Sequence, residues 1–380
     1  MASSVSDLYT RPEGVHAIPK ESLDLRPDSE IDYDLLHPKS ISSEKNIWFF
    51  WHSGFPNMHH YTQRNIRAWH RRFSKQGWTV RVIDRQRSSP LNVANFLDIS
   101  DLGTFPSAFI DGTIGGEHSP QHTSDLVRFP LLLKYGDRMW RETIDNDASP
   151  FELLSYNAGT VDERCLTNYF LASKRSNPML ERSHKLLLAL WAADGVDGGS
   201  FTIEEDGKII SAEECSKLLT DYIIQGQAMT MVLGLVDEND NWDGPRYSAE
   251  HVYAIEYMEG SQLINELTAW DGPKAFALMS LSIPRNGEAE SPEQTQAREI
   301  VEACLKRSFG FKLAHGLILR VLGETLGSLW RKHDGSDIVP GTYADWLRHG
   351  MIYWTQDGLP SRMEFQIMEP IKRGSLLASI

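Results

Sequence analysis

The sequence has only three cysteines, Cys165, Cys215 and Cys304, and no two of them form a CxxC motif. This wide spacing argues against a disulfide framework and against a cysteine-based zinc cluster. Basic residues are also few, because 38 Lys and Arg face 52 Asp and Glu, which gives a net charge of −14. The acidic balance argues against nucleic acid and against an anionic membrane surface as the main partner.

Long apolar runs are absent as well. The most apolar long stretch, residues 311–330, is interrupted by Lys312, Arg320 and Glu324, so we expect no integral membrane segment and a cytoplasmic protein. Two catalytic motifs are also missing. No G-x-G-x-x-G follows the first predicted strand, and no G-x-S-x-G occurs at a strand-to-helix turn, which disfavours a dinucleotide-dependent oxidoreductase and a serine hydrolase.

What the sequence does contain is an α/β opening. Residues 46–51 form a short apolar run typical of a strand buried on both faces, residues 58–76 have helical periodicity, and residues 78–84 predict a second strand. Such a strand, helix and strand favour a parallel crossover, whose ligands collect at the carboxyl ends of the strands. This places the loop from Trp51 to Gly54 and Asp84 at one rim. Trp51 could instead be a core aromatic residue, and Asp84 a strand-end turn residue.

Residues 119–136 predict the next long helix. Ser119 is suited to be its N-cap, Pro120 fits the first turn, and Gly136 supplies the stop. Three polar residues recur at three-residue spacing along one side, namely His122, Asp125 and Arg128. The Asp and Arg could form a plain ion pair, or they could present an acceptor and a forked donor to one polar ligand.

The rest of the chain is more helical. Helical periodicity covers residues 178–193, 212–234, 293–308 and 311–332. We expect three parts: a loosely structured leader over residues 1–44, an α/β core over residues 45–290, and a helical C-terminal extension over residues 291–380.

Taken together, these segments resemble a known family. The resemblance rests on Asn-Ile-Trp-Phe-Phe-Trp-His-Ser-Gly at 46–54, Gly-Trp-Thr-Val-Arg-Val-Ile-Asp at 77–84, and Thr-Ser-Asp-Leu-Val-Arg-Phe-Pro-Leu-Leu-Leu-Lys-Tyr-Gly at 123–136. In this order and spacing they resemble the capsular-polysaccharide-synthesis group of glycosyltransferases, a relative of the sugar-binding "DXD" glycosyltransferases. The segment that begins at Asn168 is similar to fungal members.

The resemblance implies an A-type glycosyltransferase fold, with a Rossmann-like parallel or mixed sheet. It also implies transfer of a sugar from a UDP- or GDP-sugar to a glycan, lipid or small-molecule acceptor, with retention of anomeric configuration. Carried over by position, Trp51 would stack on the nucleobase, Asp125 would accept hydrogen bonds from donor hydroxyls, and Arg128 would contact the sugar or diphosphate. From their places at the strand ends and on the helix, and not from the resemblance, Gly54, Asp84 and His122 are also predicted to bind the substrate.

One departure from the family pattern follows Gly136. Family members continue with a second Gly and a short strand that leads to an acidic Asp-x-Asp motif, which holds Mn²⁺ or Mg²⁺ against the diphosphate. Here Asp137 follows, and the nearest Asp-x-Asp is Asp145-Asn146-Asp147. Asp145 and Asp147 could be the metal ligands, or they could form an exposed turn before Pro150. The chain is therefore expected to be a glycosyltransferase or a catalytically impaired relative that binds a nucleotide or glycan.

Overall fold

The computed structural model describes residues 9–43, 45–116, 118–136, 149–193, 203–205, 208–210, 224–285, 287–313, 319 and 323–375. The chain divides into two compact units built from interleaved segments. The first unit contains Met1–Leu35, Asn57–Val80 and Glu256–Ser361, and the second contains Leu36–Pro56, Arg81–Ile255 and Arg362–Ile380. The linear division into three parts that the sequence suggested stays a prediction.

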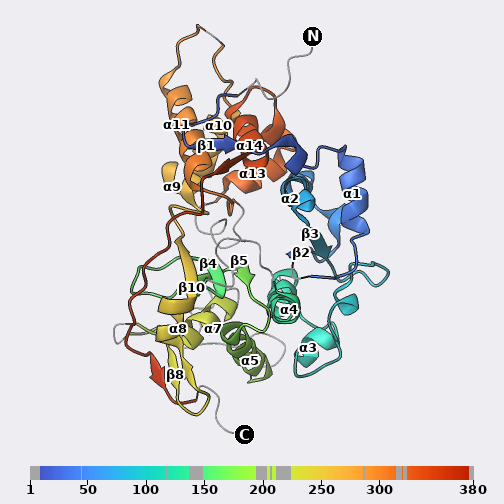
Figure 1. Cartoon of the computed structure of the whole chain (residues 1–380), viewed down its shortest axis with the longest axis vertical. Helices are drawn as coiled ribbons and strands as arrows, with labels where there is room; N and C mark the ends of the chain where they lie inside the picture. Colours follow the sequence, from blue (N-terminus) through green and yellow to red (C-terminus); the bar gives the residue numbers. More distant parts are fainter. Residues whose placement is uncertain are drawn as a thin grey trace. The chain divides into compact units, whose positions relative to one another are not determined.

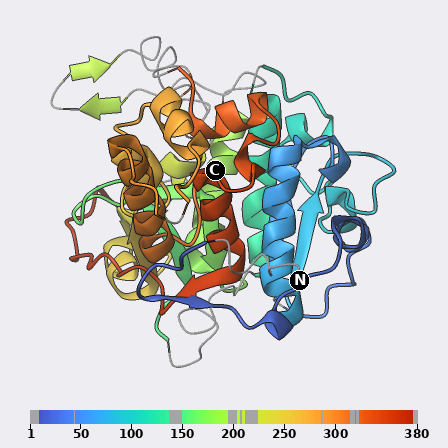
Figure 2. The ribbon, with the colours of Figure 1, turned by 90° about the horizontal axis from the view of Figure 1, so that it is seen from above.

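The first unit is mainly helical. Its regular elements are β1 (Val15–Ala17), α1 (Asp28–Leu36), α2 (His60–Phe73), α9 (Leu263–Leu267), α10 (Gly272–Ser280), α11 (Pro292–Arg307), α13 (Leu326–Lys332), α14 (Tyr343–Tyr353) and β11 (Trp354–Gln356). Helices α10, α11, α13 and α14 enclose one apolar core, and β1 pairs antiparallel with β11 (Figures 1 and 2). A Cβ on Gly350 of α14 would lie 2.4 Å from Leu305 Cδ2 on α11. A larger residue at this position would therefore displace the side chain of Leu305.

The second unit combines helices with small sheets. Its strands are β2 (Asn46–Phe50), β3 (Thr79–Ile83), β4 (Leu153–Asn157), β5 (Leu166–Ser173), β6 (Ile203–Glu205), β7 (Lys208–Ile210), β8 (Leu235–Asp237), β9 (Trp242–Asp243), β10 (Val252–Glu256) and β12 (Lys372–Arg373). They form the sheets β2-β3, β6-β7, β10-β4-β5 and β12-β8-β9. The strand β3 begins in the first unit and ends in the second. A mixed α/β class is confirmed, whereas no sheet of the described chain has more than three strands.

The described residues of this unit also form the helices α3 (Ser107–Ile110), α4 (Ser119–Tyr135), α5 (Pro178–Ala193), α7 (Ile224–Leu233) and α8 (Gly244–His251). Figure 1 shows α4 and α5 side by side, and α7 near α5 and β5. Their apolar faces share a core in which Leu126 and Phe129 of α4, Leu153 of β4 and Met229 of α7 are fully buried. The helix α4 is therefore anchored through its apolar residues, and His122 and Asp125 of the same helix are buried with them.

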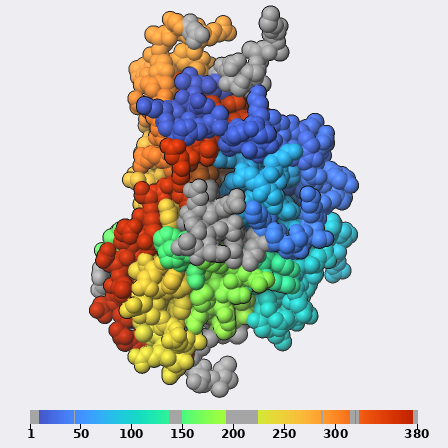
Figure 3. Space-filling view, viewed as in Figure 1, coloured from blue at the N-terminus to red at the C-terminus, as the bar shows by residue number. Residues whose placement is uncertain are grey.

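Residues 362–375 lie along this unit as an extended segment. Figure 3 shows it in red beside the yellow surface that β8 and β10 contribute to. The amide of Met363 donates to the carbonyl of Ala254 at 2.8 Å, and the amide of Ile371 donates to that of Gly234 at 2.7 Å. The guanidinium of Arg164 stacks on the ring of Phe365, 4.1 Å from its centroid. Backbone and side-chain contacts together hold this segment against the sheets.

Several expected elements agree with the structure. The two strands predicted at the opening correspond to β2 and β3, and α5 has the predicted bounds. The helix expected over 311–332 was wrong, because residues 311–313 and 323–325 are not helical and α13 begins at Leu326. Gly323 adopts a φ of +83°, and Thr325 caps α13 through a capping box with Ser328, so the helix starts anew there. Part of the helix expected over 212–234 lies outside the described residues.

One smaller expectation also differs from the structure. Ser119 is the first residue of α4 and not its N-cap, because its Oγ donates to the carbonyl of Ile114 at 2.8 Å while His118 occupies the cap position. Residues 9–43 contain β1 and α1, and Ile31 and Leu35 of α1 are fully buried. In the described part of the chain, no helix has both the length and the apolarity needed to cross a membrane.

Candidate functional site

The ends of β2 and β3 lie together in the second unit. The amide of Trp51 donates to the carbonyl of Ile83 at 3.0 Å, and the amide of Arg85 donates to the carbonyl of His52 at 3.2 Å. The loop closes when the amide of Gly54 donates to the carbonyl of Trp51 at 2.8 Å. The structure thus brings Trp51, Gly54 and the residues after β3 to one rim.

Asp84 organises this rim. Its side chain is almost fully buried, and its Oδ2 accepts a hydrogen bond from Ser89 Oγ at 2.7 Å while its Oδ1 accepts one from the amide of Gln86 at 2.9 Å. Gly54 has a φ of +83°, and a Cβ at this position would lie 3.2 Å from Asp84 Oδ2. The carboxylate therefore holds its own turn together, as in the strand-end interpretation. Contact of Gly54 or Asp84 with a substrate stays a prediction.

A cation that the sequence analysis did not single out lies beside this turn. The guanidinium of Arg85 stacks on the ring of Phe109, 4.3 Å from the centroid, and its Nη2 donates to the carbonyl of the same residue at 3.2 Å. Burial lowers the pKa of Arg85. A strand-end position next to Asp84 is the signal that could have drawn attention to it.

The polar residues of α4 form the second part of the site. Arg128 Nη1 donates to Asp125 Oδ1 at 2.8 Å, and the two side chains are 25% and 12% exposed. This is therefore a largely buried pair and not an ion pair on a wet helix face. His122 lies one turn earlier and is almost fully buried, with its ring edge-on to Trp191 at a centroid distance of 5.7 Å. A substrate contact through His122 stays a prediction.

Two amide side chains from other elements reach the same pair. Gln225 of α7 is fully buried; its Nε2 donates to the backbone carbonyl of Asp125 at 2.7 Å, and its Oε1 accepts a hydrogen bond from Arg128 Nη1. Asn168 of β5 donates from Nδ2 to Asp125 Oδ1 at 3.4 Å. Sequence reasoning missed both roles. Asn168 begins a segment similar to fungal members, whereas Gln225 has no sequence signal beyond a polar residue after two isoleucines.

The strand β2 and the helix α4 are in direct contact. The rings of Trp48 and Tyr135 lie 5.4 Å apart, and Trp48 Nε1 donates to the carbonyl of Gly136 at 3.4 Å. The second unit therefore connects the strand that leads to Trp51 with the helix that carries Asp125. All six residues predicted for substrate binding or catalysis belong to this unit.

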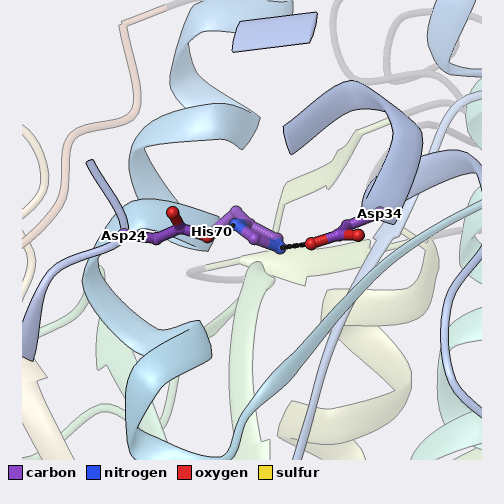
Figure 4. A group of neighbouring side chains, drawn as sticks. All are labelled: Asp24, Asp34 and His70. Atoms are coloured by element: carbon purple, nitrogen blue, oxygen red, sulfur yellow. Dashed lines mark ion pairs between the residues drawn. The ribbon is translucent and has the colours of Figure 1, made fainter. Parts of the chain in front are cut away.

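The predicted metal ligands, Asp145 and Asp147, lie outside the described residues. Within the described residues, one group of three or more potential ligands comes together, namely Asp24, Asp34 and His70 of the first unit (Figure 4). Arg26 Nη2 donates to Asp24 Oδ2 at 2.6 Å and also to Asp34, and this guanidinium lowers the pKa of Asp24 to about 2. Because Arg26 already supplies the positive charge between the two carboxylates, this group does not need a metal ion.

The chain is similar in sequence to known proteins. The family described as "Capsular polysaccharide synthesis protein" matches residues 25–195. The O-glycosyltransferase braB of Annulohypoxylon truncatum is 30% identical over 407 residues, covering 96% of this chain and 93% of that protein. The chain belongs to this glycosyltransferase family.

Further relatives of this glycosyltransferase are also fungal. The O-glycosyltransferase PaGT of Phomopsis amygdali is 28% identical and covers 95% of this chain and 93% of its own. The glycosyltransferase afumC of Aspergillus fumigatus is 29% identical, with 91% and 95% covered. No solved structure matches the chain. The family match includes β2, β3, α4, β4 and β5 but ends before Gln225 of α7.

Proposed function

We propose that this chain is an O-glycosyltransferase with an A-type fold that moves a sugar from a nucleoside-diphosphate sugar to a hydroxyl group of a glycan, lipid or small-molecule acceptor. In this reaction the bond from the anomeric carbon to the diphosphate oxygen breaks, and a bond to the acceptor oxygen forms. The acceptor hydroxyl loses its proton, and a nucleoside diphosphate leaves. We propose retention of configuration from the family resemblance. Two fungal relatives named O-glycosyltransferases support a hydroxyl acceptor.

The observation that carries the proposal is the largely buried pair of Asp125 and Arg128. A buried ion pair is weak evidence for a stabilising role, because the desolvation of both charges offsets much of their attraction. A desolvated carboxylate is, however, a strong acceptor for sugar hydroxyls, and a guanidinium presents a planar fork that suits phosphate oxygens. The pair therefore combines the two chemistries that a nucleotide sugar requires.

The remaining roles follow from residue chemistry. The indole of Trp51 offers an aromatic face for a nucleobase at the rim where β2 and β3 end. A bound divalent cation would neutralise charge on the leaving diphosphate. Asp145 and Asp147 are the proposed ligands, and this assignment rests on the sequence alone.

The test compares the parent chain with variants of the pair. Thermal stability is measured with UDP- and GDP-sugars, with and without Mn²⁺, because a ligand at 100 times its dissociation constant adds about 2.7 kcal/mol to folding stability. Release of nucleoside diphosphate reports donor cleavage without knowledge of the acceptor. We expect Asp125→Asn to reduce cleavage by about 10²-fold or more. The control is Asp101→Asn, which removes an exposed carboxylate from the same unit.

Three outcomes separate the possibilities. Donor binding with cleavage that depends on Asp125 supports the proposal. Binding without cleavage in any condition would indicate the non-catalytic relative that the departure after Gly136 suggests. If Asp125→Asn cleaved the donor at the rate of the parent chain, this pair would not be part of the active site.

A further inference from the structure

Gln225 occupies an unusual position for an amide side chain. It is the second residue of α7, it is fully buried, and it lies beyond the part of the chain that the family match covers. A buried amide costs free energy unless its donors and acceptor are used. Both ends of Gln225 are used, and both contact residues of α4.

The two hydrogen bonds of Gln225 involve Arg128 and the backbone of Asp125. The carbonyl oxygen of Gln225 accepts from Arg128 Nη1, which also donates to Asp125 Oδ1 at 2.8 Å. The amide nitrogen of Gln225 donates to the backbone carbonyl of Asp125 at 2.7 Å. One guanidinium nitrogen is thus held between a carboxylate on its own helix and an amide from another helix.

This geometry limits the freedom of a long side chain. Arg128 would otherwise sample many rotamers, and fixing such a side chain on ligand binding reduces affinity. Its Nη2 donates to Ser124 Oγ of the same helix at the longer distance of 3.4 Å. Among the residues that the structure describes, Gln225 is the one outside α4 that forms a hydrogen bond with Arg128.

We infer that Gln225 is a positioning residue of the donor site, which holds Arg128 in the orientation that receives the nucleoside-diphosphate sugar. The inference rests on the proposed function. Gln225 itself does not contact the donor, and its effect passes through Arg128. The residue thereby makes the start of α7 part of the donor site, although the family match stops short of this helix.

The experiment uses Gln225→Met, which keeps the length of the side chain but removes both polar ends. The donor KM, the kcat for donor cleavage and the thermal midpoint are measured for the full chain. We expect the donor KM to rise about tenfold, equivalent to ~1.4 kcal/mol, with a smaller change in kcat. Gln225→Asn, which is one methylene shorter and cannot span both contacts, carries the same test if the Met variant does not fold.

Thr230→Val is the matched control on the same helix. Thr230 Oγ1 donates to the carbonyl of Arg164 at 2.8 Å, so this change also removes a side-chain hydrogen bond of α7 but leaves Arg128 untouched. We expect its donor KM to stay within twofold of the parent. A rise equal to that of Gln225→Met would show that any weakening of α7 impairs binding, and this would overturn the inference.

A double-mutant cycle with Arg128→Met decides whether Gln225 acts through Arg128. In that background Gln225→Met should change the donor KM by less than twofold. Equal losses in both backgrounds would overturn the inference, as would a folded Gln225→Met variant with the donor KM of the parent. A parent chain that neither binds nor cleaves any donor would overturn the proposed function and this inference together.

Discussion

Gly54→Ala tests how tightly the rim at the ends of β2 and β3 is built. Gly54 adopts a φ of +83°, and an added Cβ would lie 3.2 Å from Asp84 Oδ2. The substitution therefore adds a backbone strain and a crowded contact. Gly112 of the same unit provides the matched control, because it has a φ of +69° and no atom within 4 Å of an added Cβ.

The two effects can be separated in magnitude. A non-glycine residue in the left-handed region costs about 1–2 kcal/mol, and the reduced entropy of the unfolded chain offsets about 0.4–1 kcal/mol. At the centres of these ranges Gly112→Ala should therefore lose about 0.8 kcal/mol. In Gly54→Ala the carboxylate of Asp84 must also move, which weakens its bonds to Ser89 Oγ and to the amide of Gln86. One such bond is worth about 0.5–1.5 kcal/mol, so the total loss should be roughly 1–2.5 kcal/mol.

Urea unfolding measures the difference. With a slope of about 3 kcal/mol/M, the midpoint should fall by roughly 0.3–0.8 M for Gly54→Ala and by no more than about 0.3 M for Gly112→Ala. Donor affinity should also fall for Gly54→Ala, because the loop that carries Trp51 is displaced, and should be unchanged for Gly112→Ala. Equal urea midpoints and equal donor affinities for the two variants would show that the contact between residue 54 and Asp84 does not constrain this rim.

Two further predictions concern the core of the second unit. Leu126→Ala on α4 should lower the free energy of unfolding in urea by about 2–5 kcal/mol, because Leu126 is fully buried. The control Leu102→Ala should change it by less than about 0.5 kcal/mol, because Leu102 is 70% exposed. Equal losses in the two variants would contradict the assigned core. Burial lowers the pKa of His184 to about 4 from its ordinary value of 6.5, so the unfolded chain binds the extra proton between these values and stability is lost as the pH falls from 6.5 to 4. Because of this group, the free energy of unfolding should be lower by about 2 kcal/mol at pH 5 than at pH 7. The His184→Gln variant should lack this part of the difference. The same pH dependence in the parent and in the variant would contradict the prediction.

The sequence predicted the elements whose signals are local. The run at 46–51 and the stripe at 119–136 identified β2 and α4 because burial on both faces and helical spacing leave a direct pattern in the residues. The pairing of Asp125 with Arg128 also followed from their three-residue spacing. The prediction of a helix over 311–332 was wrong because it rested on apolar residues that continue on both sides of Gly323, where the backbone has a positive φ.

Other parts of the site depend on contacts distant in sequence. Gln225 and Asn168 reach Asp125 from α7 and β5, and no local pattern indicates which polar side chain will meet which helix. The buried state of His122 likewise depends on Trp191, a residue of α5. The interleaving of the two units could not be predicted, because it depends on which distant segments pack together.

That interleaving sets the order in which the strands of one sheet are made during synthesis. The residues Glu256–Ser361 of the first unit are made after β8 and before the segment that contains β12. In the finished sheet β8 lies between β9 and β12. While Glu256–Ser361 is being translated, β8 is an edge strand, and an open edge can pair with another chain. Self-association through β8 is therefore open to the emerging protein in this interval, and β12 covers this edge once it pairs.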